Sequence, residues 1–472
     1  MRRAGSLLKN AEHGRRRPVK ALPVNNEQST DDTWTFKGFP AGVDAIMAPL
    51  PTQESPAAMS NATKTPLSSA DRATPHFTSA AAPSALRMML ALEDFEAPAR
   101  RYIPRPIYGY VAGGVERNVT LNWNRSVFDD LALVPRQLVG VAQRTQKTTL
   151  FGVTYDSPFG IAPMGGTSLA GYNGDLSLAC AAASANVPMI LSGASLTALE
   201  KVRAASPRHT WFQAYLPGEE EAITKLVERV TKAGYDTLVL TVDIPVGSNR
   251  ENNVRNGYNA PLRPSLRLAL QCLAHPRWLF GTALRSYFNH GMPHFENMGK
   301  QRTPLVSRTA VRERANRDHL NWEHVALMRR LWKGKLVIKG ILDKRDAVIA
   351  REHGADGIIV SNHGGRQLDS GTSPLRVLPG IVAAASDMTV MIDSGFRRGT
   401  DVLKALALGA KFVFVGRPML YAAAIGGEDG VRHALTLLHA EVDRDMAMLG
   451  CNTVAEVTRD CLMDARGFDG LF

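Results

Sequence analysis

Residues 356–367 read DGIIVSNHGGRQ, and this stretch decides the fold. Its apolar part, residues 357–360, is too short for a helix and is bounded by polar residues, which is typical of a strand buried in a parallel sheet. His363, two glycines and Arg366 follow at the end of the expected strand. The stretch therefore predicts a buried strand that presents charged side chains where it ends.

The same pattern of a short apolar run that ends in glycine or polar residues recurs along the chain. Stretches with helical signals, such as 220–234, 343–355 and 399–410, separate many of the runs. The eight runs are FGIAPMGG (159–166), PMILSGAS (188–195), TWFQAYL (210–216), DTLVLTVDIP (236–245), KLVIKGI (335–341), DGIIVSNHGG (356–365), TVMIDSG (389–395) and KFVFVGRP (411–418). Alternating strands and helices over roughly 300 residues favour the α/β class and a closed (β/α)8 TIM barrel.

The rest of the chain divides around this barrel. Residues 1–87 are rich in Ala, Ser, Thr and Pro, and we expect a disordered extension, because such a segment buries too little apolar surface to offset the entropy lost on ordering. Residues 88–472 are expected to form one barrel domain. Within it, residues 244–322 after the fourth strand are too long for a simple connection, so we expect an insertion with a function of its own.

Composition excludes several classes of protein. The 472 residues carry a formal net charge of +12 and only four cysteines. No basic stripe interleaved with aromatic residues accompanies this charge, so we expect no nucleic-acid partner. The cysteines form no CxxC pair, so we expect neither a disulfide framework nor a metal site, which suits a cytoplasmic protein. No apolar run approaches the roughly 18 residues of a membrane span.

Polar side chains stand at most of the predicted strand ends. One such residue usually just hydrogen-bonds to a loop, but several charges gathered at one end of a barrel are costly to bury unless they pair or bind a ligand. This face is also where barrel enzymes build their active sites. The candidates are Gln213, Tyr215, Thr241, Asp243, Lys339, Asn362, His363, Arg366, Asp393, Gly416 and Arg417.

The last two predicted strands carry a phosphate signal. IDSGFRRG (392–399) and VGRP (415–418) place Gly395, Gly416 and arginines on successive loops. Barrels commonly bind phosphate there through backbone N–H groups and a helix N-terminus. We therefore expect a phosphorylated cofactor or substrate.

From about residue 90 to the C-terminus, the chain resembles the FMN-dependent enzymes that oxidise 2-hydroxy acids, the family of the glycolate oxidase, L-lactate dehydrogenase and mandelate dehydrogenase type. The resemblance rests on TVDIP (241–245), LVIKGI (336–341), SNHGGRQLD (361–369) and IDSGFRRGTDVLKALALGA (392–410) followed by VGRP, all in the family's order. It implies an FMN cofactor and a homo-oligomer, often a tetramer.

The resemblance also implies a substrate site. His363 resembles the family's active-site base, and Asp243 resembles the carboxylate that orients it and stabilises its imidazolium. A histidine supported in this way can take a proton near neutral pH. Arg366 and Arg250 resemble the two substrate-site arginines, Arg366 holding the substrate carboxylate, and Tyr110 and Tyr215 resemble its two tyrosines.

For the flavin, Lys339 resembles the lysine that lies beside the N1 and C2-carbonyl edge, where a cation stabilises negative charge on the reduced ring. Asp393 resembles the residue that contacts the ribityl chain. The remaining residues expected at the cofactor are Met164, Gly165, Ser192, Gln213, Thr241 and Ser361 around the ring, and Gly395, Arg397, Gly416 and Arg417 on the phosphate.

Two features of the sequence bear on substrate and partners. Gly165 and Ala194 stand where glycolate oxidases have Ala and Trp, which predicts a substrate bulkier than glycolate. Residues 263–298 mix Arg, Trp, Phe and Leu with no acidic residue before Glu296. Such a segment suits a peripheral contact with an anionic membrane; the alternative is a soluble active-site lid.

Together these features predict FMN-dependent oxidation of an L-2-hydroxy acid to the 2-oxo acid, with electrons passing to a quinone or another acceptor at the cytoplasmic face of the inner membrane. One alternative is an oxidase that uses oxygen and produces hydrogen peroxide. An alternative of another class is a flavin- or phosphate-binding barrel without catalysis, which the fold alone would permit.

Overall fold

The computed structural model describes residues 83–258, 261–298, 302–307 and 317–465. Most of the extension that we expected to be disordered, residues 1–82, lies outside the described residues. Residues 83–87 of the expected extension are described, and among them Leu86 is buried and packs against Gly426.

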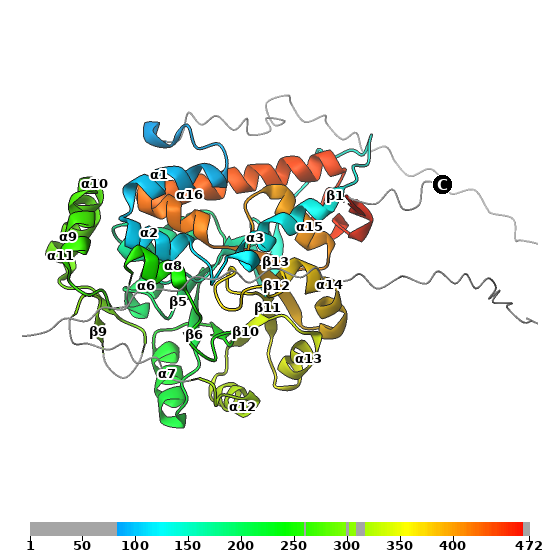
Figure 1. The fold of residues 1–472 in the computed structure, drawn as a ribbon. Helices are drawn as coiled ribbons and strands as arrows, with labels where there is room; N and C mark the ends of the chain where they lie inside the picture. Colours follow the sequence, from blue (N-terminus) through cyan, green and yellow to red (C-terminus); the bar gives the residue numbers. More distant parts are fainter. Residues whose placement is uncertain (1–82, 259–260, 299–301, 308–316, 466–472) are drawn as a thin grey trace, which may run out of the picture. The chain divides into compact units, whose positions relative to one another are not determined.

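Eight parallel strands close into a barrel in the order β4-β5-β6-β7-β10-β11-β12-β13 (Figure 1), which confirms the predicted fold class. Each strand lies inside one of the eight apolar runs. The strands are β4 (Phe159–Ile161), β5 (Met189–Ser192), β6 (Thr210–Tyr215), β7 (Thr237–Thr241), β10 (Lys335–Ile341), β11 (Gly357–Val360), β12 (Thr389–Asp393) and β13 (Phe412–Val415).

The strands separate two apolar cores, because alternate residues of a strand face opposite sides of the sheet. In β7, Val239 belongs to the core inside the barrel, whereas Leu238 and Leu240 belong to the core between strands and helices. Both faces are thus covered, which explains why the strand sequences read as continuous apolar runs.

Helices surround the barrel on its outer face. The last of them, α16, has 33 residues and a break at Gly427, and α1 packs along it. The barrel helices are α4 (Thr167–Ala170), α5 (Gly174–Ser184), α6 (Leu199–Ala205), α7 (Glu220–Lys232), α12 (Trp322–Leu331), α13 (Lys344–Glu352), α14 (Pro374–Ala385), α15 (Gly399–Ala407) and α16 (Arg417–Leu449).

Short elements precede and follow the barrel. The helix α2 contacts α4 and α8, and β1 pairs antiparallel with β14, so the segment before the barrel meets the segment after it. These elements are η2 (Ser84–Leu86), η3 (Leu92–Phe95), α1 (Glu96–Tyr102), α2 (Arg105–Ala112), α3 (Val119–Ser126), η4 (Val127–Asp130), β1 (Leu131–Leu133), β2 (Thr148–Leu150), β3 (Val153–Tyr155), η6 (Val454–Glu456), η7 (Arg459–Cys461) and β14 (Leu462–Asp464).

The predicted insertion lies between β7 and β10 and contains α8 (Glu251–Asn256), α9 (Leu266–Leu273), α10 (Pro276–Trp278), the π-helical turn η5 (Leu279–Leu284), α11 (Arg285–His290), β8 (His294–Phe295) and β9 (Thr303–Pro304). Its helices α9 to α11 stand at the edge of the barrel (Figure 1). Trp278 donates from Nε1 to the carbonyl of Leu169 at 3.0 Å, and the hydroxyls of Tyr102 and Thr282 lie 2.7 Å apart. These contacts fix the insertion to the barrel. Among the helices in the described ranges, none is long and apolar enough to cross a membrane.

Candidate active site

A cavity of about 1170 Å³ opens at the carboxyl ends of the barrel strands. Sites for single small molecules usually measure about 300–1,000 Å³, so this cavity can hold a cofactor together with a substrate. Of the residues that the sequence predicted for the site, all but four line its wall. The wall residues are Tyr110, Met164, Gly165, Gln213, Tyr215, Thr241, Arg250, Lys339, His363, Arg366, Asp393, Gly395, Arg397, Gly416 and Arg417.

The other four, Asp243, Ser192, Ser361 and Asn362, lie behind the wall. The first three hold residues that line it, and Asn362 Oδ1 accepts a hydrogen bond from the backbone N–H of Gly365 at 3.0 Å. Ser192 donates from Oγ to Gln213 Oε1 at 3.2 Å. The hydroxyl of Ser361 accepts hydrogen bonds from Lys339 Nζ at 2.7 Å and from the backbone N–H of His363 at 3.0 Å. In this structure these side chains support the site from behind.

The turn after β11 places His363 at the cavity. His363, Gly364 and Gly365 have φ angles of 58°, 67° and 74°, in the left-handed region that glycine adopts readily and histidine tolerates. A Cβ atom on Gly365 would lie 2.7 Å from backbone atoms of Leu121. The two glycines thus permit a sharp turn that points His363 into the cavity.

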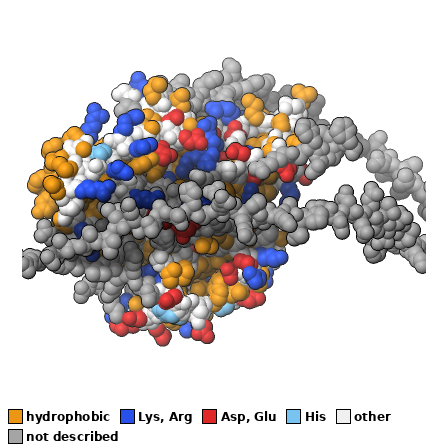
Figure 2. Space-filling view, viewed as in Figure 1, with side chains coloured by type: hydrophobic (Ala, Val, Ile, Leu, Met, Phe, Trp, Pro, Cys, Tyr) orange, Lys and Arg blue, Asp and Glu red, His pale blue; other side chains and the backbone are white. Residues whose placement is uncertain are grey.

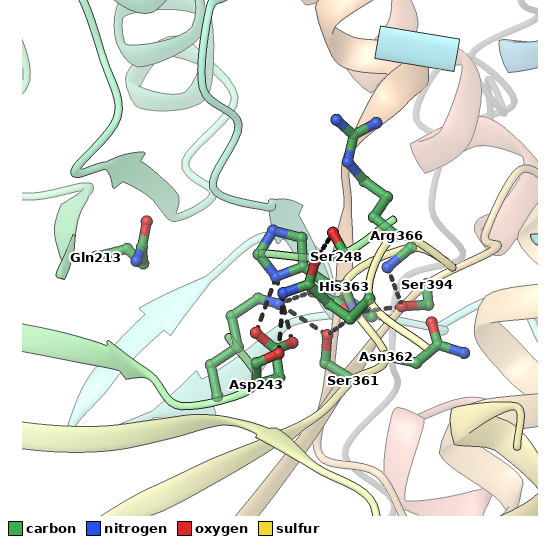
Figure 3. Close-up of polar contacts among 12 residues, drawn as sticks. Gln213, Asp243, Ser248, Ser361, Asn362, His363, Arg366 and Ser394 are labelled. Carbon is green, nitrogen blue, oxygen red and sulfur yellow. Dashed lines mark hydrogen bonds and ion pairs between the residues drawn. The ribbon is translucent and has the colours of Figure 1, made fainter. Parts of the chain in front are cut away.

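The imidazole of His363 is paired with Asp243 (Figure 3). Nδ1 of the ring lies 3.0 and 3.2 Å from the two carboxylate oxygens. Since a carboxylate only accepts hydrogen bonds, Nδ1 carries the proton and Nε2 keeps its lone pair. Burial lowers the pKa of His363, although Asp243 opposes this shift, so the ring is neutral near pH 7. An imidazole in this state can accept a proton, and the carboxylate then stabilises its charge.

Asp243 remains ionised despite being almost buried. Burial by itself would raise its pKa, but His363, Lys339 and Arg250 outweigh this effect and lower it. Gln367 donates to the backbone carbonyl of Asp243 at 2.9 Å and so fixes the loop that carries the carboxylate.

Two arginines approach the same part of the cavity. Nη1 of Arg366 donates to the backbone carbonyls of Tyr110, Val111 and Gly113 at the end of α2. Within the described residues, its Nε and Nη2 make no hydrogen bond, so they are available to a ligand. Arg250 is held by Gln367, at 2.7 Å from Nη2 to Oε1, and burial beside Arg366 lowers the pKa of Arg250 to about 10. A carboxylate ligand would relieve the repulsion between these cations.

Lys339 supplies a buried cation at the cavity wall. Its Nζ lies 2.9 Å from a carboxylate oxygen of Asp393. Burial alone would lower the pKa of Lys339, but the carboxylates of Asp393 and Asp243 raise it. The ammonium group is therefore charged at every physiological pH.

The remaining groups on the wall fit the chemistry of FMN. The buried Nε2 of Gln213 makes no hydrogen bond within the described residues, so a donor is available for a ring carbonyl or ring nitrogen. Arg397 and Arg417 form no ion pair with a described carboxylate, and burial lowers the pKa of Arg417 to about 10. Two buried guanidinium groups beside Gly395 and Gly416 suit a phosphate.

Sequence reasoning missed several residues of the site. The ring of Tyr258 stacks on that of Tyr110 with centroids 4.3 Å apart, and Asn124 bonds beneath the turn to the side chain of the predicted candidate Asn362. Sequence reasoning also missed Gln367, which holds Arg250 and the backbone of Asp243. Its place in the stretch 356–367, directly after Arg366, was the one signal in the sequence that could have indicated it.

Comparison with known proteins defines the class. Residues 99–464 match the model of the FMN-dependent dehydrogenase family, and the chain belongs to this family of FMN-dependent oxidoreductases. Its cofactor is therefore FMN, and the alternative of a barrel without catalysis is not supported.

The most informative relatives have names that refer to the 2-hydroxy acids mandelate and lactate. (S)-Mandelate dehydrogenase of Pseudomonas putida is 38% identical over 374 residues, covering 79% of this chain and 93% of that protein. L-lactate dehydrogenase of Xanthomonas campestris pv. campestris (strain 8004) is 38% identical over 379 residues, covering 79% and 96%. The crystal structure of the monotopic membrane protein (S)-mandelate dehydrogenase has a TM-score of 0.73 and 36% identity, covering 80% of this chain and 100% of that one. Mandelate oxidase with 3,3-difluoro-2-hydroxy-3-phenylpropionic acid has a TM-score of 0.65 and 33% identity, covering 79% and 98%.

Proposed function

We propose that this protein oxidises an L-2-hydroxy acid to the corresponding 2-oxo acid, with His363 as the base. The observation that carries the proposal is the bond from His363 Nδ1 to Asp243, in a cavity that also contains Arg366 and Lys339. A 2-hydroxy acid must lose two electrons and two protons, so its oxidation needs a base, a site for the carboxylate and an electron acceptor.

The residues divide this work. Arg366 and Arg250, with Tyr110, bind and orient the substrate carboxylate, which fixes the hydroxyl-bearing carbon beside His363. Nε2 of His363 accepts a proton from the substrate, and Asp243 stabilises the imidazolium that results. FMN, when bound, takes up the two electrons. Lys339 stabilises negative charge at the pyrimidine edge of the ring, and Arg397 and Arg417 hold the phosphate.

The test is an anaerobic screen of the flavin-loaded protein. We expect L-lactate, (S)-mandelate or a longer L-2-hydroxy acid to bleach the flavin absorbance near 450 nm. If the flavin stayed oxidised with every member of the series, the proposed function would be refuted.

The cavity supports a substrate with a sizeable side chain. Gly165 and Ala194 both line the wall, and a Cβ on Gly165 would lie 2.9 Å from Cβ of Ala194. The two positions are thus already in contact, so larger residues there would project into the cavity and reduce its volume. The two mandelate-oxidising relatives support the same size class, since mandelate carries a phenyl group.

We propose a quinone or a similar organic oxidant as the electron acceptor, in preference to oxygen. The relatives named dehydrogenases support this choice, and the relative named mandelate oxidase keeps the oxygen-using alternative open. Turnover in air with peroxide detection, compared with anaerobic turnover on a quinone, distinguishes the two acceptors.

We also propose that α9 to α11 contact an anionic membrane. Leu266, Leu270, Leu273, Phe280 and Phe288 are exposed, and Figure 2 shows hydrophobic and basic side chains gathered at the edge where Figure 1 places these helices. Exposed apolar side chains flanked by arginines are typical of interfacial segments, and each basic residue adds about 1 kcal/mol near an anionic surface. A relative described as a monotopic membrane protein supports a membrane contact. We propose the cytoplasmic face of the inner membrane as its location.

Sedimentation with vesicles tests this contact. We expect the protein to sediment with anionic vesicles and a Leu266→Ser/Leu270→Ser/Leu273→Ser variant to remain in solution with unchanged flavin bleaching. Equal behaviour of the two proteins would favour the soluble-lid alternative. We also propose a homo-oligomer, and the family resemblance suggests a tetramer. Light scattering of the purified protein would measure its mass.

A further inference from the structure

We infer that the outer zone of the active-site cavity, defined by Val246, Val254, Pro261 and Arg263, is the docking site of a quinone with an apolar tail. The inference rests on the proposed function, because it locates the acceptor that the reaction requires.

The cavity wall changes character from its floor to its opening. The floor is built by strand ends and carries the charged groups, including His363, Lys339 and Arg366. The outer zone is built by the insertion, from residues 244–249, α8, Pro261, Arg263 and Arg317. Its lining includes two exposed valines, Val246 and Val254. Their exposed fractions are 59% and 74%, so two apolar side chains face solvent at the opening of a cavity whose floor is charged. A small polar hydroxy acid gains nothing from this apolar rim, whereas an apolar oxidant does.

The apolar rim continues onto the surface of α9. Nη2 of Arg267, in the first turn of α9, donates to the carbonyl of Arg255 in α8 at 3.2 Å, so the two helices adjoin. The rim residue Val254 and the first residue of the exposed leucine row, Leu266, which is 77% exposed, thus belong to adjoining helices. The helices α8 and α9 lie on the same side of the barrel in Figure 1. A long apolar tail can remain on this row while its head group enters the cavity.

Charge excludes another kind of acceptor. Among the described residues that line the outer zone, none is acidic, and Arg263 and Arg317 contribute positive charge. The chain as a whole has a net charge of +12. A cationic redox protein would be repelled from such an opening. A neutral quinone presents carbonyl oxygens, which accept hydrogen bonds from arginine.

The stoichiometry of the reaction is balanced. The hydroxy acid loses two electrons and two protons and becomes the 2-oxo acid, while the quinone gains two electrons and two protons and becomes the quinol. No other oxidant is needed in the cycle.

The experiment compares flavin-loaded Val254→Asp with the wild type and with a control, Met448→Asp. Met448 is also an apolar residue on a helix, with a 69% exposed side chain. Three quantities are measured: the rate of anaerobic bleaching by an L-2-hydroxy acid, turnover with a short-chain water-soluble quinone and with a long-tailed quinone in anionic vesicles, and turnover with ferricyanide.

We expect Val254→Asp to raise the KM for both quinones at least about tenfold, because an apolar ligand that covers the rim would have to strip water from the new carboxylate. Bleaching and ferricyanide turnover stay at the wild-type rate, and Met448→Asp changes none of the three quantities. We expect the same result from Val246→Asp, on another part of the rim. This variant replaces Val254→Asp in the experiment if Val254→Asp does not fold.

An unchanged KM for quinone in both valine variants overturns the inference, and so does an equal loss with ferricyanide, which would indicate a general effect on the opening. A wild-type protein that is bleached but that no quinone reoxidises also overturns the inference and leaves the proposed function intact. A wild-type protein that no hydroxy acid bleaches refutes both.

Discussion

Arg366 is bound to Tyr110 in two ways: Nη1 donates to the backbone carbonyl of Tyr110 at 2.7 Å, and the guanidinium carbon lies 4.8 Å from the centre of the Tyr110 ring. One arm of the guanidinium is thereby fixed to α2, and the group also packs against the ring. Its position is thus defined before any substrate enters.

The first prediction concerns the shape of this cation. Arg366→Lys keeps the charge but loses the planar fork. We expect transition-state stabilisation to decrease by about 1.5–3 kcal/mol, so that kcat/KM for the hydroxy acid falls roughly 10- to 150-fold. Steady-state kinetics measures the loss. Arg376→Lys, which alters a surface pair with Asp130, is the control and leaves kcat/KM unchanged.

Replacement of His363 separates chemistry from cofactor binding. His363→Ala should retain FMN, because the phosphate and ring contacts are made by other residues, while the bleaching rate falls by about 10²- to 10⁴-fold, the usual contribution of a general base. Stopped-flow absorbance measures the rate. His353→Ala, at the end of α13, is the matched control, and normal bleaching in His363→Ala would remove His363 from its role.

The pH dependence follows from the His363 and Asp243 pair. The base works when neutral, so kcat/KM should fall as the pH drops through the pKa of His363, which burial holds below its ordinary value of about 6.5. Asp243 raises that pKa, so Asp243→Asn should move the acid limb to lower pH and reduce the plateau. A shift of the limb to higher pH would contradict this assignment.

Stability depends on the buried pair of Lys339 and Asp393. Lys339→Met leaves the carboxylate buried without its cation, which should cost about 3–5 kcal/mol of unfolding free energy. Urea denaturation followed by tryptophan fluorescence measures the loss. The double variant Lys339→Met/Asp393→Asn should recover part of it, and equal losses in the single and double variants would show that the pair is not coupled.

Substrate size is controlled at Ala194. Ala194→Trp should fill the space beside Gly165, so that turnover of (S)-mandelate falls at least about tenfold relative to turnover of glycolate. The ratio of the two kcat/KM values is the measurement. An unchanged ratio would place the substrate side chain elsewhere in the cavity.

The barrel could be predicted because its signals are local. A run such as 357–360 contains both the apolar strand and the polar residues that end it, and the spacing of eight such runs defines the closed sheet. Motif order was enough to identify residues such as His363 and Asp243, since each stands at the end of its own strand.

Contacts between distant segments could not be predicted in this way. The carbonyls that bind Arg366 belong to α2, and no periodicity in α2 indicates that its last turn faces a strand end. The position of Ser361 behind the wall was also missed, because sequence shows that a residue follows a strand but not whether its side chain faces the cavity or a neighbour.

The bond between Arg366 and Tyr110 spans 256 residues of sequence, which has a consequence for biosynthesis. At about 5–20 residues per second, a ribosome makes the carbonyls of α2 roughly 13–50 s before it makes the arginine that they bind. During that interval the α2 carbonyls have no partner from the turn that follows β11. A stalled or truncated nascent chain that ends before residue 366 would thus contain the first strands of the barrel and no catalytic centre.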